Sequence, residues 1–247
     1  MRYFIAFSYN GAAYHGWQNQ PNAISVQEVL EKALSTLLRT TVEVVGAGRT
    51  DTGVHARQMY AHFDSSLSID ARELVFRLNS FLPNDIAVKE LKRVSSEAHA
   101  RFDALERTYE YWIAQKKDPF LHTSAHCVLK PLDLPLMNEA ARILMEYEDF
   151  ECFSRSNTDV KTFICDVREA FWKKEGEKLI FTISADRFLR NMVRAIVGTL
   201  LEVGTDKRKP QDIRKIIDSK DRGNAGASVP AKGLYLTKVV YPETIFK

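Results

Sequence analysis

The sequence contains only three cysteines, and no two of them form a C-x-x-C pair. An odd number without such pairs indicates neither a disulfide framework nor a cysteine zinc site, so Cys127, Cys152 and Cys165 are interpreted as reduced thiols. His122 and His126 stand near Cys127, but no second pair of ligands follows them. We therefore predict no bound metal.

Long apolar runs are also absent. No stretch of about 18 apolar residues could form a membrane span, and the first residues, MRYFIAFSYNG, alternate like a strand instead of forming the hydrophobic region of a signal peptide. We therefore expect a cytoplasmic protein without a membrane partner. With 45% hydrophobic and 27% charged residues and no low-complexity tract, the composition is typical of a folded domain.

A strong charge imbalance is absent too. The formal net charge is +3, which is compatible with a nucleic-acid partner but does not require one. Basic residues are in excess between Lys161 and Arg222, a segment that includes Lys207, Arg208 and Lys209. A solvated face explains this excess as well as a bound polyanion does.

Hydrophobic periodicity predicts the same order of elements twice. The first hundred residues follow the order β-α-β-β-α-β, and the order then restarts with one extra helix. Ser25 and Glu28 form a capping box at the start of the first helix. The predicted strands are 3–9, 42–47, 58–63, 86–91, 108–114, 167–172, 179–184 and 234–240, and the predicted helices are 25–38, 70–81, 135–146, 187–203 and 210–219.

This order predicts an α+β protein with two tandem ferredoxin-like (βαββαβ) halves. The predicted domains are residues 1–104 and 105–247, each with an antiparallel sheet, and the two flank a central active-site cleft. The architecture serves RNA-binding modules, carrier domains and many enzymes, so it does not determine the function.

The segment G-A-G-R-T-D-T-G-V-H, residues 46–55, lies between two predicted strands. Its glycines at 46, 48 and 53 allow a positive φ or a close approach to another group. Arg49 stands two residues before Asp51, and a neighbouring guanidinium lowers the pKa of a carboxyl group and keeps it ionised. For an isolated T-D-T-G, a simple turn in which Asp51 bonds its own backbone is the alternative.

These ten residues closely resemble the G-R-T-D-x-G-V-H-A signature of the tRNA pseudouridine synthase A family, in which the Asp is catalytic. Other segments resemble that family in the same order along the chain. They are Y-N-G-A-A-Y-H-G-W-Q at 9–18, L-P-N-D-I at 82–86, H-A-R-F at 99–102, R-T-Y-E-Y at 107–111 and F-L-R-N-M-V-R-A-I-V-G at 188–198. Asn10 and Thr52 depart from the common Asp and Ala, but neither departure touches a catalytic atom.

The resemblance implies a homodimeric isomerase that needs no cofactor or metal and converts uridines 38, 39 and 40 of the tRNA anticodon stem-loop to pseudouridine. It implies that Asp51 is catalytic and that Tyr109 stacks on the base and handles protons beside Asp51. It also points to Arg49 and Arg194 as partners of Asp51 and of the flipped nucleotide. The RNA contacts that it implies are Arg101, Lys116, Lys117, Arg155 and Lys161, and the loop 155–161 would help to extrude the base.

Two details follow from the residues themselves. Arg187, Arg190 and Arg194 are spaced three and four apart at the start of a predicted helix, where the macrodipole disfavours cations, so the stripe suggests an anionic partner. Alternatively, Asp186 is the N-cap and the arginines are solvated. Tyr111 is predicted to be a core residue two positions beyond Tyr109.

A single carboxylate suits isomerisation better than hydrolysis, because the detached uracil recaptures C1′ and no water has to be activated. Asp51 could attack C1′, add to C6 or remove a sugar proton, and the sequence leaves these routes open. Two other functions also stay open. One is a non-catalytic RNA-binding protein with tandem RRM-like sheets, and the other is a nucleosidase or glycosidase that releases free uracil.

Overall fold

The computed structural model describes residues 1–155 and 160–246. The predicted α+β class is confirmed. Contacts divide the chain into an amino-terminal unit, Met1–Glu106 with Tyr235–Lys247, and a carboxy-terminal unit, Arg107–Leu234. The last strand therefore groups with the amino-terminal unit, which differs from the predicted division at residue 104. Within the described part of the chain, no helix combines the length and apolar character that a membrane span requires.

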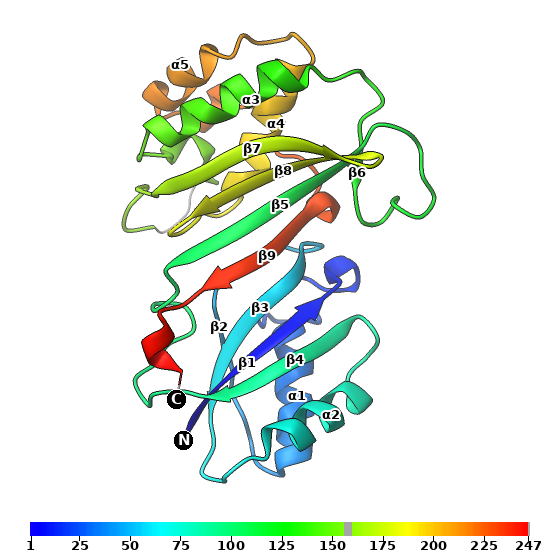
Figure 1. Ribbon diagram of the computed structural model, residues 1–247, viewed down its shortest axis with the longest axis vertical. Helices are drawn as coiled ribbons and strands as arrows, with labels where there is room; N and C mark the ends of the chain where they lie inside the picture. The colour runs from blue at the N-terminus through cyan, green and yellow to red at the C-terminus, as the bar shows by residue number, and fades with distance from the viewer. Residues whose placement is uncertain (156–159, 247) are drawn as a thin grey trace. The chain divides into compact units, whose positions relative to one another are not determined.

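The sheet of the amino-terminal unit has the strand order β4-β1-β3-β9, and β2 pairs with β3 (Figure 1). Its strands are β1 (Arg2–Tyr9), β2 (Val45–Gly46), β3 (His55–Asp64), β4 (Ile86–Arg93) and β9 (Leu234–Val240), and its helices are α1 (Val26–Leu38) and α2 (Ala71–Phe81). The pairings of β1 with β3 and with β4 are antiparallel, but β3 and β9 run parallel. The prediction of an antiparallel sheet is therefore wrong at β9, because this strand enters from the far end of the chain instead of from a hairpin.

Both helices of this unit begin at a capping side chain, and the Ser25 cap of α1 was predicted. The Ser25 hydroxyl accepts a hydrogen bond of 3.1 Å from the amide of Glu28, and Asp70 accepts bonds from the amides of Arg72 and Glu73. These bonds satisfy amides that have no partner inside the helix. The inner face of α1 buries four apolar side chains, Val26, Leu30, Ala33 and Leu34.

The predicted strand 42–47 is reduced to the two residues of β2, because side chains of α1 bind the backbone before it. The amide of Val44 donates to Glu31 Oε1 at 2.9 Å, and the carbonyl of Val44 accepts from Gln27 Nε2 at 3.0 Å. The amide of Val42 donates to the Ser35 hydroxyl at 2.9 Å. Backbone groups that are paired in this way do not join a strand ladder.

The end of the chain is fastened to the amino-terminal unit beyond β9. The Tyr241 hydroxyl donates to the carbonyl of Ala100 at 2.5 Å, and the Ser95 amide donates to the carbonyl of Ile245 at 3.2 Å. The ring of Tyr241 meets that of Phe4 edge-on, with centroids 5.1 Å apart. The carboxy-terminal residues are thus part of the core of this unit.

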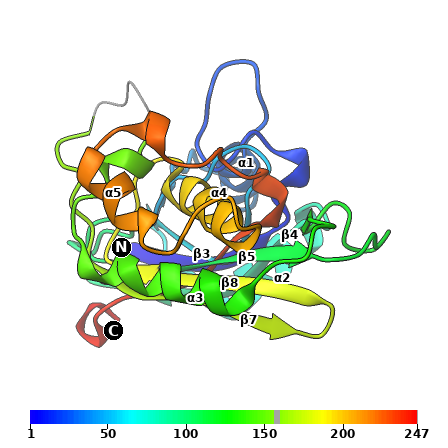
Figure 2. The same cartoon turned by 90° about the horizontal axis from the view of Figure 1, so that it is seen from above.

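The carboxy-terminal unit contains the antiparallel strands β5, β8 and β7 in that order, with the short β6 parallel to β5. Helix α3 packs against both β7 and α4, and the two helices lie together in both views (Figures 1 and 2). The strands are β5 (Glu106–Ala114), β6 (His126–Cys127), β7 (Val167–Glu175) and β8 (Lys178–Ala185), and the helices are α3 (Leu134–Ile143), α4 (Met192–Gly204) and α5 (Asp212–Ser219).

A buried histidine on β3 makes the amino-terminal unit sensitive to acid. His62 is 6% exposed, and its Nδ1 accepts a hydrogen bond of 3.1 Å from the amide of Ala100. Burial, together with the positive charges of Arg2 and His99, lowers the pKa of His62 to about 4. The ring therefore stays neutral in the folded state at a pH where an unfolded chain would protonate it.

We predict that the free energy of unfolding falls by about 2 kcal/mol between pH 7 and pH 5 through His62 alone. Between pH 7 and pH 5, His62 binds a proton in the unfolded state but not in the folded state. Acid therefore favours unfolding. Urea denaturation at the two pH values should show a smaller loss for His62→Gln than for the wild type. The exposed His122 provides the control, because His122→Gln should keep the wild-type pH dependence. Equal pH dependence in the wild type and His62→Gln would contradict this assignment.

Candidate functional site

The loop between β2 and β3 carries Asp51 in a tight turn. The Val54 amide donates to the carbonyl of Asp51 at 3.1 Å, and Gly53 inside the turn has φ +77°. Asp51 is half-buried, whereas Arg49 and Thr52 are exposed. Whether Arg49 pairs with Asp51 stays a prediction.

The segment that follows β1 holds this loop on both sides of Asp51. Before Asp51, the Thr50 carbonyl accepts a hydrogen bond of 3.3 Å from the amide of Trp17, and the Thr50 and Tyr9 hydroxyls share one of 2.8 Å. After it, the Gly53 amide donates to the carbonyl of Tyr14 at 3.3 Å. Hydrogen bonds at Thr50 and Gly53 thus join the backbone on both sides of Asp51 to a segment about forty residues earlier in the chain.

Gly16 makes this approach of two backbones possible. Its φ is +91°, and a Cβ at this position would lie 2.3 Å from the carbonyl oxygen of Thr50. In the loop itself, Gly46 lies against the ring of Trp17 and Gly53 has a positive φ, as predicted. The prediction is wrong for Gly48, where a Cβ would meet nothing within 4 Å.

The motif at residues 82–86 supports, from the other side, the segment 9–18 that holds the loop. The Tyr14 hydroxyl donates to Asp85 Oδ1 at 2.6 Å, and the Asn10 amide donates to the carbonyl of Asp85 at 2.8 Å. Burial, helped by the bond to Asp85, raises the pKa of Tyr14. Two segments that are far apart in the sequence, residues 9–18 and 82–86, therefore fix the loop 46–55.

The histidine of the loop motif has a structural role that the sequence did not reveal. His55 is 2% exposed, and its Nδ1 accepts a hydrogen bond of 3.0 Å from the amide of Gly11. Its ring stacks on that of Tyr235, with centroids 4.6 Å apart. The imidazole therefore joins the start of β3 to β9 and to the turn after β1.

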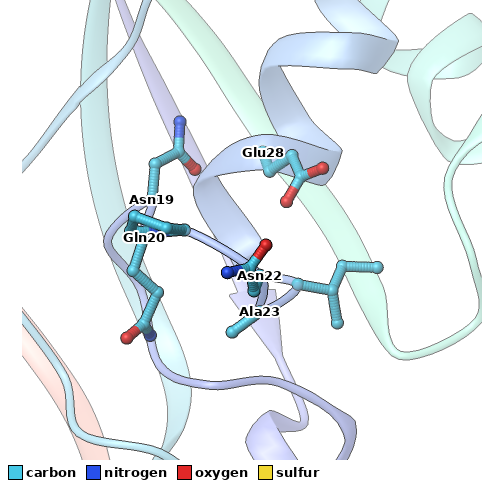
Figure 3. Close-up of a pocket in the computed structure, with 7 residues that line it drawn as sticks. Asn19, Gln20, Asn22, Ala23 and Glu28 are labelled. Atoms are coloured by element: carbon cyan, nitrogen blue, oxygen red, sulfur yellow. The ribbon is translucent and has the colours of Figure 1, made fainter.

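A surface hollow lies beside the segment 9–18, at the start of α1. It is lined by residues 19–24 and by Glu28 (Figure 3). Asn19 is fixed at its edge, because its amide donates to Gln27 Oε1 and its side chain donates to Glu31 Oε2. None of the residues predicted to take part in the site lines this hollow.

Tyr109 and Tyr111, in the carboxy-terminal unit, have different environments although they lie on the same strand. Tyr109 on β5 is half-buried, and its ring meets the ring of Phe188 edge-on at 5.2 Å. Tyr111 is fully buried, and its hydroxyl donates to the carbonyl of Pro230 at 2.8 Å. The prediction that Tyr111 is a core residue is confirmed.

Arg194 lies in the first turn of α4 and is half-buried. Its Nε donates to the carbonyl of Val229 at 2.7 Å, and the Val229 amide donates back to the carbonyl of Arg194 at 3.2 Å. This pair of bonds sets the direction of the guanidinium group.

The predicted arginine stripe is wrong, because α4 begins at Met192 and both Arg187 and Arg190 precede it. The N-cap is Asn191, with φ +68°, and not Asp186. Asp186 Oδ1 instead accepts hydrogen bonds from the amides of Asp166 and Arg187, so it stabilises a turn before the helix.

The five predicted RNA contacts are all exposed: Arg101, Lys116, Lys117, Arg155 and Lys161. The guanidinium of Arg101 lies over the ring of Phe102, 5.6 Å from its centroid. Lys116 forms an ion pair of 3.4 Å with Glu177. In the loop 155–161, residues 156–159 lie outside the described residues. Arg101 belongs to the same unit as Asp51, and the other four belong to the carboxy-terminal unit.

We predict that Gly16→Ala lowers the free energy of unfolding by at least about 2 kcal/mol, because a Cβ cannot occupy the space at Thr50 and φ +91° strains any other residue. Gly48→Ala is the matched control, and it should change stability by less than about 0.5 kcal/mol, because its Cβ meets open space. Urea titration of the three proteins measures both values. Similar stability in the two variants would show that the contact between these backbones does not constrain the loop.

Comparisons with known proteins agree with this arrangement of motifs. The family described as tRNA pseudouridine synthase matches residues 5–103 and 140–242, a range that includes the Asp51 loop, both segments that hold it, and α4. The tRNA pseudouridine synthase A of Bacteroides thetaiotaomicron is 55% identical over 99% of this chain and 92% of its own length. The protein of the same name from Bacillus licheniformis is 42% identical over 98% of this chain and 99% of its own length. The chain therefore belongs to the tRNA pseudouridine synthase family.

Proposed function

We propose that this protein converts uridines 38, 39 and 40 of the tRNA anticodon stem-loop to pseudouridine, with Asp51 as the catalytic carboxylate. Family membership supports the reaction and the substrate class. The observation that carries the assignment of Asp51 is the pair of hydrogen bonds on either side of it, from the Trp17 amide to the Thr50 carbonyl and from the Gly53 amide to the Tyr14 carbonyl. A carboxylate on a backbone held in this way is positioned before the substrate arrives.

The chemistry explains why one carboxylate is enough. The N1–C1′ bond breaks, the base turns, and a C5–C1′ bond forms while C5 loses a proton and N1 gains one. Nothing is added to the nucleotide and nothing leaves it. A hydrolase has a second carboxylate to handle an attacking water, whereas here the uracil itself is the acceptor. Asp51 serves as an ionised group at C1′, at C6 or at a sugar proton, and each of these routes needs it fixed in place.

Tyr109 and Arg194 are the proposed partners of the flipped nucleotide in the carboxy-terminal unit, and Arg49 is proposed in the amino-terminal unit. The contact with Phe188 restricts the Tyr109 ring, and this suits an aromatic wall for an extruded base. The bond to Val229 orients the guanidinium of Arg194, and this suits an anionic partner.

The remaining parts of the proposal concern the wider substrate and the assembly. The exposed Arg101, Lys116, Lys117, Arg155 and Lys161 supply contacts to tRNA phosphates, which offset the cost of extruding the base. The family resemblance supports a cytoplasmic homodimer of two ferredoxin-like halves that acts without a cofactor. The pairings β4-β1-β3-β2 support that fold for the amino-terminal half.

We predict that Asp51→Asn abolishes turnover but leaves tRNA affinity within about threefold, because the phosphate contacts lie on other residues. The measurement is release of tritium from C5 of uridine in labelled tRNA, with filter binding of the same tRNA in parallel. Free uracil should be absent. Release by Asp51→Asn at the wild-type rate would overturn the mechanism, free uracil would favour a nucleosidase, and binding without any wild-type release would favour a non-catalytic RNA-binding protein.

Tyr109→Phe is expected to bind tRNA normally but to lower kcat at least about 100-fold, because the ring remains while the hydroxyl that handles protons is lost. Tyr111→Phe is the matched control on the same strand. It removes the hydrogen bond to Pro230, so it should reduce stability by about 1 kcal/mol with little change in kcat. Single-turnover tritium release and urea denaturation separate the two effects. A reduced kcat in Tyr111→Phe alone would refute the assignment of Tyr109.

A further inference from the structure

The connection between β5 and β6, residues 115–125, presents an aromatic side chain to solvent. Phe120 is 92% exposed, the largest fraction among the exposed large hydrophobic side chains of residues 1–155 and 160–246. Burial of a phenylalanine side chain stabilises a protein, and Phe120 gains almost none of this stabilisation. A single exposed hydrophobic residue is common, so a role for it depends on its surroundings.

Local hydrogen bonds fix the conformation of this connection. The Phe120 amide donates to Asp118 Oδ1 at 2.8 Å, and the Ala125 amide donates to the carbonyl of Leu121 at 2.8 Å. Lys232 reaches across from another part of the same unit, and its Nζ donates to the carbonyl of His122 at 2.6 Å. Figures 1 and 2 both show the connection projecting beyond the strands of its unit. Phe120 is therefore held outward on an ordered turn.

The surroundings of Phe120 are mainly basic. Lys116 and Lys117 precede it on the same connection, and both are exposed. Two more lysines are joined to this connection, by the bond from Gln115 to the backbone of Lys130 and by the bond from Lys232 to the backbone of His122. Two acidic residues oppose these four lysines: Glu177 pairs with Lys116, and Asp118 caps the turn.

We propose that Phe120 stacks on an unpaired base of the tRNA substrate while Lys116 and Lys117 contact the flanking phosphates. Aromatic rings that stand among basic side chains are the usual elements of single-strand recognition, because every base has a π-face and every nucleotide a negative charge. Phe120 is a positioning residue in this assignment, since it holds RNA and takes no part in the bond exchange. The inference rests on the proposed function for its substrate, and it adds a contact that no family motif supplies.

Substitutions separate base stacking from an apolar contact with protein. Phe120→Ala and Phe120→Leu should each weaken binding of an unmodified tRNA transcript roughly 5- to 100-fold, because neither residue offers a flat ring. Phe120→Tyr should stay within about threefold of the wild type. Leu129→Ala is the matched control, because Leu129 is 70% exposed just beyond β6 and has no ring to lose. An apolar docking surface would instead respond to Phe120→Leu less than to Phe120→Ala, and would also respond to Leu129→Ala.

Salt titration gives a second, independent signature. Phe120→Ala should weaken binding equally at every salt concentration, whereas Lys117→Ala should reduce the slope of log affinity against log salt by about one. Wild-type affinity in Phe120→Ala, or equal losses in Phe120→Ala and Leu129→Ala, would overturn the proposal. A change of molecular mass on sedimentation of Phe120→Ala would also overturn it, because it would assign the ring to a contact between protein chains.

Tritium release by the wild type is measured alongside binding. Release by the wild type together with unaltered binding by Phe120→Ala would overturn the stacking contact and leave the proposed isomerisation standing. Weakened binding by Phe120→Ala with no release by the wild type would support the stacking contact and overturn the isomerisation.

Discussion

The amino-terminal unit depends on a contact between two backbones at Gly16 and Thr50. Hydrogen bonds from Trp17 and to Tyr14 fasten the residues on both sides of Asp51, and they form only because no Cβ stands between the two segments. Backbone groups make rigid anchors, since they have no side-chain torsions to restrict. The position of the backbone that carries this carboxylate is therefore set by peptide groups.

The polar residues around Asp51 divide into chemical and structural groups, and residue type alone does not separate them. His55 and Asp85 have side chains that could serve as acid or base, but the structure places both in structural contacts, with Gly11 and with Tyr14. A histidine that accepts a hydrogen bond in a buried stack cannot move freely to a substrate. The hydrogen-bond partners and the burial of a side chain identify the motif residues that support the loop. The ability of a side chain to act as an acid or a base does not.

Local patterns predicted most of the elements and the Asp51 loop, because turns, caps and amphipathic faces are encoded within a few residues. The α1 helix and its Ser25 cap are examples. The predictions failed where the local structure is determined by contacts with distant segments or by contacts that compete with a strand or a helix. Side chains of α1 bind the backbone before β2, Asp186 stabilises a turn where a helix start was predicted, and β9 joins a strand from the opposite end of the chain. The bracing of the Asp51 loop by Tyr14 and Asp85 was likewise outside the reach of local periodicity, since it joins segments separated by about seventy residues.

The return of the last strand has a consequence for how the protein is made. Residues 107–234 form a unit from one continuous stretch of the chain, so a ribosome delivers all of it before residues 235–247 are made. The amino-terminal unit, although its synthesis starts first, lacks β9 and the Tyr241 contact until residues 235–247 have emerged. The start of β3, at His55 and Ala56, stays without its partner strand β9 throughout that interval, and an open strand edge is a site where chains associate wrongly. The order of synthesis and the order of completion are therefore opposite, and the Asp51 loop before β3 gains its full support only when residues 235–247 have been made.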